Sequence, residues 1–429
     1  MTRHFHTVVV GGGCLGCASA ISVRRRIRRS ADTPGGRVCL LEKSVVGSGL
    51  TARHSGIVRA ANAVPKAAYL AKRATDYWLD LQSVWGVSIE YDACGAVWIA
   101  RAVDGGRNDQ WEALAESMSG LGIAFSQLDR REVQDVCTRS VILHDDEVYF
   151  REPNAMQFDP AVVRHALYGA LKANDIEVAE RTAVQGFEAH DDGEIKSVIT
   201  SEGAITCDFV VNAAGAWSPS VFASLGISIP VSVEPVHVVN WMTSEFEIRG
   251  AMPIIADYVN LAYFRLWRDG EIHMHQPRRR TVRETARAFA ESTLNVTGAD
   301  FINDPTNQGL GYSQIRVYED ITRKRFRNVD NTVYGSGYRS YFDITPDLKF
   351  ILGADHRVRN LIHCLGSGQA FKYTPVFGEI VADCIMGGGE YYHAIDEFSI
   401  ARFDDEYMRN FWQKVSGTEH SLEAEAASL

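Results

Sequence analysis

Three glycines near the start of the chain, Gly11, Gly13 and Gly16, have the spacing of a turn that binds phosphate groups. They lie between an apolar run at residues 6–10 and a helical pattern. Glycine at these positions allows a tight turn and lets the backbone approach a pyrophosphate closely, while the N–H groups at the start of the helix face the negative charge. The glycines therefore predict a nucleotide-binding turn.

Glu42 follows the next apolar run, residues 38–41, where an acid can accept hydrogen bonds from ribose hydroxyls and would repel a 2′-phosphate. The interval from the glycines to Glu42 exceeds the usual ~20 residues, and a polar loop at residues 29–37 can absorb the excess. Together these features predict a dinucleotide site. They do not distinguish NAD from FAD, and an α/β core without a ligand is the alternative.

The elements that position this turn follow from hydrophobic periodicity. Strand, turn, helix and strand form the βαβ unit of a parallel sheet. Helical spacing recurs at residues 65–85, 160–173, 281–294 and 374–386, and strand patterns at 91–101, 177–179, 207–211 and 361–364. Residues 231–272 have the composition of an antiparallel sheet.

These elements predict an α/β protein of two interleaved domains. We expect a Rossmann-type domain, a parallel sheet with helices, formed by residues 1–90, 150–222 and 335–415. We expect an antiparallel-sheet substrate domain at residues 91–149 and 223–334, and a flexible tail at 416–429.

Composition limits the classes of function. A net charge of −10 argues against nucleic acid or an anionic membrane as the main partner. No apolar stretch approaches the roughly 18 residues of a membrane span, so we expect a cytoplasmic protein. The eight cysteines have no repeated spacing and indicate reduced thiols, with Cys14 and Cys17 as packing residues. No metal-binding or hydrolase motif is present in the sequence.

Further segments resemble one family, the FAD-dependent amine oxidoreductases of the D-amino-acid-oxidase superfamily, nearest to sarcosine oxidases and dimethylglycine oxidases or dehydrogenases. The similar segments are residues 47–59, 208–218, 345–347 and 366–372, in the family's order and spread over nearly the whole chain. The resemblance implies FAD as the cofactor. It also implies that the cofactor is contacted by Gly11, Gly13, Cys14, Leu15, Gly16, Glu42, Lys43, Ser48, Arg53, His54, Ser55, Gly56, Val184, Ala214, Gly215, Trp217, Gly366, Ser367, Gly368, Gln369 and Lys372.

The resemblance also implies a carboxylate-binding pair, Arg59 and Lys372. A guanidinium and an ammonium that converge on one pocket suit a carboxylate through charge-assisted hydrogen bonds. The alternatives are a structural ion pair for Arg59 and a contact with flavin alone for Lys372. His275 is the best match to a histidine that assists the family's active site, with His273 on the same face as a rival, and Tyr263 is expected to line the pocket.

The chain departs from the family pattern at three positions. Ser340 replaces the cysteine that bonds to flavin in monomeric sarcosine oxidase, and His54 lies one residue from the histidine that does so in the dimethylglycine group. We therefore expect non-covalent FAD. Glu271 falls where the oxidases have a lysine that promotes reaction with oxygen, so the electron acceptor is either O2 or an electron-transfer partner.

The function implied by the resemblance is oxidation of the C–N bond of an amino acid or amine. FAD would accept a hydride at N5 and leave an imine, and a helix that begins near Thr374 would stabilise the reduced flavin through its dipole. The alternatives are a flavoprotein dehydrogenase or electron-transfer subunit of a heteromeric complex, and an NAD-linked dehydrogenase.

Overall fold

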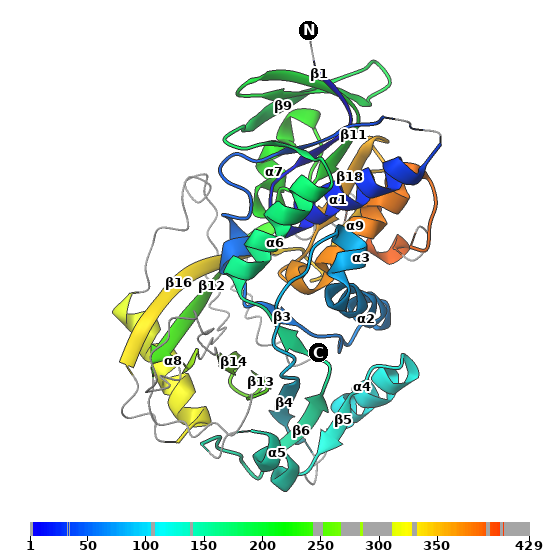
Figure 1. Cartoon of the computed structure of the whole chain (residues 1–429). Coiled ribbons are helices and arrows are strands. Elements are labelled where there is room, and N and C mark those ends of the chain that lie inside the picture. Colours follow the sequence, from blue (N-terminus) through cyan, green and yellow to red (C-terminus); the bar gives the residue numbers. More distant parts are fainter. Residues whose placement is uncertain are drawn as a thin grey trace, which may run out of the picture.

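The computed structural model describes residues 3–31, 33, 35–103, 108–137, 140–242, 252–266, 284–285, 311–327, 333–391, 395–403 and 406. Its largest sheet has eight strands: six follow the order β17-β18-β11-β1-β2-β8, β10 also pairs with β11, and β9 pairs with β10. In Figure 1 this sheet occupies the upper part of the molecule together with α1, α6 and α9.

The predicted βαβ unit is confirmed. β1 (Arg3–Val10) is followed by α1 (Cys14–Arg29) and by β2 (Val38–Leu41), which pairs with β1 in parallel. The inner strand residues Val8, Val9 and Leu40 are fully buried, as expected for a sheet covered on both faces. The glycine turn therefore lies at the carboxyl end of β1, the edge at which parallel sheets bind ligands.

The rest of this sheet comes from distant parts of the chain. β8 (Glu177–Ala179) pairs in parallel with β2, and β11 (Gly203–Asn212) with β1. β18 (Leu361–Leu365) continues the parallel order, while β17 (Ile351–Ala354), β9 (Val184–Ala189) and β10 (Ile195–Thr200) pair antiparallel. The helices of this region are α2 (Pro65–Leu79), α3 (Leu81–Trp85), α6 (Pro160–Ala173), α7 (Ser218–Val221) and α9 (Ala370–Met386).

Helix α9 lies against α1 at very short range. A Cβ at Gly378 would be 2.6 Å from the carbonyl oxygen of Ala18, so only glycine allows this approach. The helix begins at Ala370 rather than near Thr374 as predicted, and Pro375 lies inside it. The start of α9 thus belongs to the segment 366–372.

A six-stranded sheet, in the order β15-β14-β13-β4-β6-β5, forms the lower part of the view in Figure 1. Its strands are β4 (Ala96–Arg101), β5 (Ser126–Leu128), β6 (Glu147–Glu152), β13 (Ile254–Asp257), β14 (Ala262–Leu266) and β15 (Glu284–Thr285). The expectation of a purely antiparallel sheet is wrong at one pair, since β13 runs parallel to β4. Helix α4 (Asp109–Gly120) lies between β4 and β5 along the chain, and helix α5 (Arg130–Val136) lies between β5 and β6.

Two strand pairs join these sheets. β12 (Ser232–Met242) pairs only with β16 (Val333–Ile344) among the described strands, and β3 (Ile57–Val58) pairs with β7 (Met156–Gln157). Helix α8 (Tyr312–Arg325) precedes β16. The helix predicted at 281–294 is wrong at the two residues described there, which form β15, and its other residues lie outside the described ranges.

The predicted division into two domains remains a proposal, although the two sheets follow its main segments. The predicted tail at 416–429 lies outside the described residues. All eight cysteines are free thiols. Among the helices described, none combines the length and apolar character that crossing a membrane requires.

Candidate active site

The glycine turn is shaped by contacts that no larger residue would allow. Gly11 has a φ of +108°, and a Cβ there would lie 2.4 Å from the carbonyl oxygen of Ala213. A Cβ at Gly16 would lie 1.9 Å from the carbonyl oxygen of Gly11. The N-cap residue of α1, Gly13, has no side chain that could fill the space in front of the helix, and the first helical N–H, that of Cys14, donates to the Thr51 hydroxyl at 2.8 Å. The positive end of the helix dipole therefore faces the turn. The turn fits the pyrophosphate predicted for it.

Glu42 faces this turn from the end of β2. Its carboxylate accepts hydrogen bonds from the backbone N–H groups of Gly12 and Ser44, each at 2.8 Å. A carboxylate oxygen can accept more than one hydrogen bond, so these contacts orient the group and leave capacity for ribose hydroxyls.

Replacing Glu42 with glutamine should weaken FAD binding by about tenfold or more, because one charged acceptor becomes an amide N–H2. Fluorescence titration of the apoprotein with FAD measures the effect, and Glu116→Gln on the exposed face of α4 is the matched control. Equal affinity in the Glu42 variant and the parent would contradict the role given to this carboxylate.

Other predicted cofactor residues gather at the same edge of the sheet. The ammonium of Lys43 lies 3.9 Å from the ring centroid of Trp217, which follows Ala214 and Gly215 after β11. Val184 begins β9, two residues after Thr182, whose N–H donates to the Glu42 carbonyl at 2.9 Å. Segments far apart in the sequence thus meet beside Glu42.

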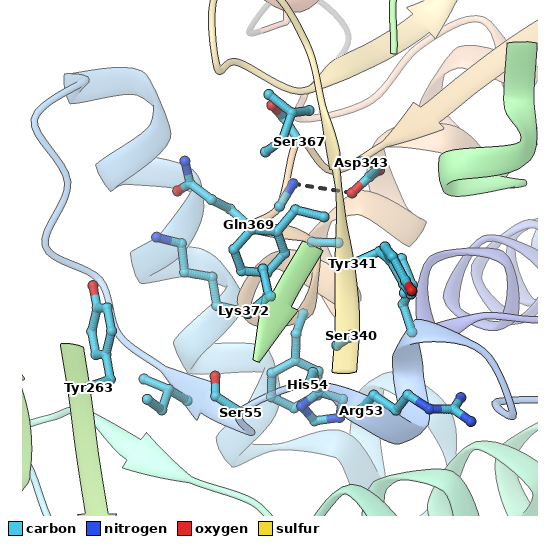
Figure 2. A pocket seen from close by; sticks show the side chains of 18 of the residues that line it. Arg53, His54, Ser55, Tyr263, Ser340, Tyr341, Asp343, Ser367, Gln369 and Lys372 are labelled. Carbon is cyan, nitrogen blue, oxygen red and sulfur yellow. Dashed lines mark hydrogen bonds between the residues drawn. The ribbon is translucent and has the colours of Figure 1, made fainter. Parts of the chain in front are cut away.

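A cavity of about 390 Å³ reaches Cys14 at the start of α1. Segments 50–59, 257–263, 340–344 and 367–372 line most of it. Among the predicted residues, it is lined by Cys14, Arg53, His54, Ser55, Arg59, Tyr263, Ser340, Ser367, Gly368, Gln369 and Lys372. In Figure 2, Tyr263 and Lys372 lie on the left of the view, and His54 and Ser340 lie to the right of them.

Arg59 follows β3 and is held from several sides. Its guanidinium donates to the carbonyl of Ala61 at 2.7 Å and to the hydroxyl of Tyr263 at 3.2 Å, and it lies 4.4 Å from the ring centroid of Trp98. Burial alone would lower the pKa of Arg59, but Tyr263 and its neighbours raise it above its ordinary value. The group is therefore a fixed, permanent cation on the cavity wall.

Lys372 lies in the first turn of α9 and is only 5% exposed. Within the described part of the chain, no hydrogen-bond acceptor contacts its Nζ, which lies 4.9 Å from the ring centroid of Tyr373. Burial, and then repulsion from Arg59, holds the pKa of this ammonium well below its usual range. An ammonium that no acceptor among the described residues contacts is available to bind an anionic group of a ligand.

The turn before α9 is anchored by an aspartate that the sequence did not identify. Asp343, at the end of β16, accepts hydrogen bonds from the N–H groups of Gly366 and Gly368 at 3.3 and 3.1 Å (Figure 2). Ser367 has a φ of +43°, and its hydroxyl bonds to that of Thr345 at 2.9 Å. Burial raises the pKa of Asp343, although these N–H groups oppose the effect.

The loop before Arg59 supplies the remaining predicted residues. Thr51, also not predicted, accepts a hydrogen bond from the N–H of Cys14 at 2.8 Å and so joins the loop to α1. Arg53 donates to the carbonyls of Ser48 and Gly49, and in Figure 2 its guanidinium points away from the other labelled side chains. Arg53 therefore stabilises its own loop.

His54 and Ser340 both line the cavity. The His54 ring stacks on Phe371 with 3.8 Å between centroids, and its Nδ1 accepts from the N–H of Gly56 at 2.7 Å. Gly56 has a φ of +70°, and a Cβ there would lie 2.0 Å from the carbonyl oxygen of Phe158. The candidates His273, His275 and Glu271 lie outside the described residues.

Sequence reasoning also missed the groups behind Arg59. Glu152, the last residue of β6, accepts hydrogen bonds from the N–H groups of Ala60 and Ala61. Tyr258 stacks on Trp98, and its hydroxyl lies 3.1 Å from that of Tyr263. Alternation along β6 could indicate only that Glu152 faces one side of a sheet, not what lies there.

Comparison with known proteins identifies a family that matches most of the chain. The model of the FAD dependent oxidoreductase family matches residues 6–384. The 4-methylaminobutanoate oxidase (formaldehyde-forming) of Paenarthrobacter nicotinovorans is 25% identical over 90% of this chain and 44% of its own length. The mitochondrial dimethylglycine dehydrogenase of Rattus norvegicus is 20% identical over 89% of this chain and 43% of its own length. The chain thus spans less than half the length of these two relatives.

Several solved structures have a fold similar to that of this chain. L-proline dehydrogenase from P. horikoshii superimposes with a TM-score of 0.76 at 21% identity, covering 94% of this chain and 98% of that chain. NikD, an amino acid oxidase of nikkomycin biosynthesis, gives a TM-score of 0.71 at 21% identity, covering 93% of this chain and 98% of that chain in its open form. At these identities the likeness shows the fold alone.

Proposed function

This chain belongs to the family of FAD-dependent oxidoreductases, and we propose that it oxidises the C–N bond of a small amine that carries a carboxylate. The observation that carries this proposal is the pair of cations on one cavity wall, the half-buried Arg59 and the buried Lys372. Two charges of the same sign that lie close together with little water around them favour the binding of an anion. A substrate carboxylate is the anion that fits a family acting on amino acids and amines.

When bound, FAD supplies a two-electron acceptor for the hydride that leaves the carbon beside the nitrogen. We propose that it is held by the glycine turn and Glu42 at one end, and by the segments 48–56 and 366–372 at the other. The glycine cradle, the start of α1 behind it and Glu42 all match the needs of a dinucleotide.

The chain's own residues then act mainly by orientation. Arg59 and Lys372 would bind the carboxylate and so fix the direction of the amine relative to the cavity. The Tyr263 hydroxyl accepts a hydrogen bond from the Arg59 guanidinium, and the Tyr258 hydroxyl bonds to that of Tyr263, so the two form a polar edge of the site. The substrate loses a hydride and a proton, the product is an imine, and water can hydrolyse it.

The relatives suggest the substrate class more closely. Those named above are an oxidase of 4-methylaminobutanoate and a dehydrogenase of dimethylglycine, both N-methylated amino acids. We propose an N-alkyl amino acid as the substrate.

A second candidate is a flavoprotein dehydrogenase that passes electrons to a protein partner. It is suggested by the dehydrogenase among the relatives named above. The electron acceptor, O2 or such a partner, is therefore part of the proposal. A cytoplasmic location rests on the free thiols and is proposed in the same sense.

The proposal is tested by anaerobic bleaching of the bound flavin with matched amines. 4-Methylaminobutanoate and sarcosine should bleach it, whereas N-methylbutylamine, which lacks the carboxylate, should need a concentration at least ~100-fold higher. If N-methylbutylamine bleaches the flavin as readily as its carboxylate analogue, the carboxylate has no role in recognition. If no amine bleaches the flavin, the proposed reaction is wrong.

A further inference from the structure

Behind the two cations lies a buried carboxylate that the reaction above does not use. Glu152 is 1% exposed and does not line the cavity. One oxygen accepts hydrogen bonds from the N–H groups of Ala60 and Ala61, the two residues that follow Arg59. Among the described residues, its other oxygen, Oε2, has no hydrogen-bond partner.

The position of Glu152 couples it to Arg59 in two ways. Its hydrogen bonds to Ala60 and Ala61 fix the backbone there. The carbonyl of Ala61 in turn accepts a hydrogen bond from the Arg59 guanidinium at 2.7 Å. Through its charge it attracts both Arg59 and Lys372. Burial raises the pKa of Glu152, while the Ala60 N–H and Arg59 favour its ionised form.

The charges of these three groups can be counted. When Arg59 and Lys372 are protonated and Glu152 is ionised, these three groups together carry one positive charge. Burial opposes the charged forms of Lys372 and Glu152 through their pKa values, whereas the attraction between Glu152 and the two cations favours them. One ligand carboxylate brings the total to zero. A second carboxylate on the ligand would leave an uncompensated negative charge in a site of low dielectric constant, which is costly.

We propose that Glu152 sets the charge of the accepted substrate, so that the site takes amines with one carboxylate and rejects those with two. The inference rests on the proposed carboxylate site and extends it to specificity. Glu152 is a positioning residue, because it acts on the ligand through Arg59, Lys372 and the field that it adds to theirs.

The test compares acetate with malonate as probes of the FAD-bound enzyme, by calorimetry and by the difference spectrum of the flavin. In the parent, acetate should bind at least as tightly as malonate. In Glu152→Gln, the ratio of malonate to acetate affinity should rise on the order of tenfold, because the extra carboxylate no longer meets a like charge. The ratio cancels effects on shape and on proton uptake that both probes share.

Two control variants and the choice of glutamine separate charge from structure. Glutamine keeps an oxygen that can accept from Ala60 and Ala61. Glu152→Asp keeps the charge and should keep the parent's ratio within about twofold. Glu202→Gln, an exposed charge in the turn between β10 and β11, should leave the ratio unchanged.

Two results would overturn the inference: tighter binding of malonate than acetate by the parent, or an unchanged ratio in Glu152→Gln. The first applies even if the variant does not fold. Failure of the proposed function looks different, since the parent would then bind neither acetate nor malonate in competition with the amine.

Discussion

A Gly16→Ala variant is expected to retain no FAD after desalting. The new Cβ would lie 1.9 Å from the carbonyl oxygen of Gly11, a contact that real structures do not contain, so the turn must open. Opening moves the backbone of residues 11–16 away from the geometry that admits a pyrophosphate. The ratio of flavin to protein absorbance measures the loss, which should exceed ~90% at micromolar FAD because even a few kcal/mol of strain lowers affinity by more than a hundredfold.

The matched control is Gly120→Ala at the end of α4. A Cβ at Gly120 meets no atom within 4 Å, so this variant should keep its full FAD content. Circular dichroism shows whether each protein is folded. A folded Gly16→Ala variant that holds FAD as tightly as the parent would show that the turn does not bind the cofactor.

Replacing Lys372 with methionine should reduce the efficiency of flavin reduction by carboxylate amines by a factor of 100 or more. The substitution keeps the buried stem and removes a charged hydrogen bond to the substrate, worth roughly 3 kcal/mol in a site away from water. Stopped-flow absorbance under anaerobic conditions gives the reduction rate and the dissociation constant separately. The loss should appear mainly in the dissociation constant.

The pH dependence has a definite sign. Because burial lowers the pKa of Lys372, the ammonium is present below that lowered pKa and is lost as the pH rises through it. Carboxylate binding by the parent should therefore weaken on the alkaline side, and the methionine variant should lack this change. Lys324→Met, on the exposed side of α8, is the control. If the methionine variant binds carboxylate substrates as tightly as the parent, Lys372 contacts the flavin alone and not the substrate.

The nucleotide half of the site could be predicted from the sequence because it depends on local chemistry. The turn at residues 11–16 and the acid after β2 belong to one βαβ unit, and adjacent parallel strands place them at one edge. Arg59 and Lys372 required the family resemblance, since they are more than 300 residues apart and nothing local joins them. The structure brings both to one cavity.

The rest depended on tertiary contacts that no periodicity reveals. Glu152, on β6, accepts hydrogen bonds from the two residues that follow Arg59, which lie in a different part of the chain. The alternation of side chains along β6 predicts only which side of the sheet Glu152 faces. The parallel pairing of β13 with β4 joins segments separated by about 150 residues, so composition indicated strands there but not their direction. Helix α9 begins before its proline because the Gly366 to Gln369 turn, held by Asp343, sets its start.

The central claim is that a flavin ring and a substrate carboxylate share the cavity between the Arg59 segment and the start of α9. The most direct measurement is a crystal structure of the FAD-bound protein with acetate. Acetate should contact the Arg59 guanidinium and the Lys372 ammonium, beside an isoalloxazine ring in the same cavity. Acetate bound elsewhere, or a flavin ring outside this cavity, would contradict it.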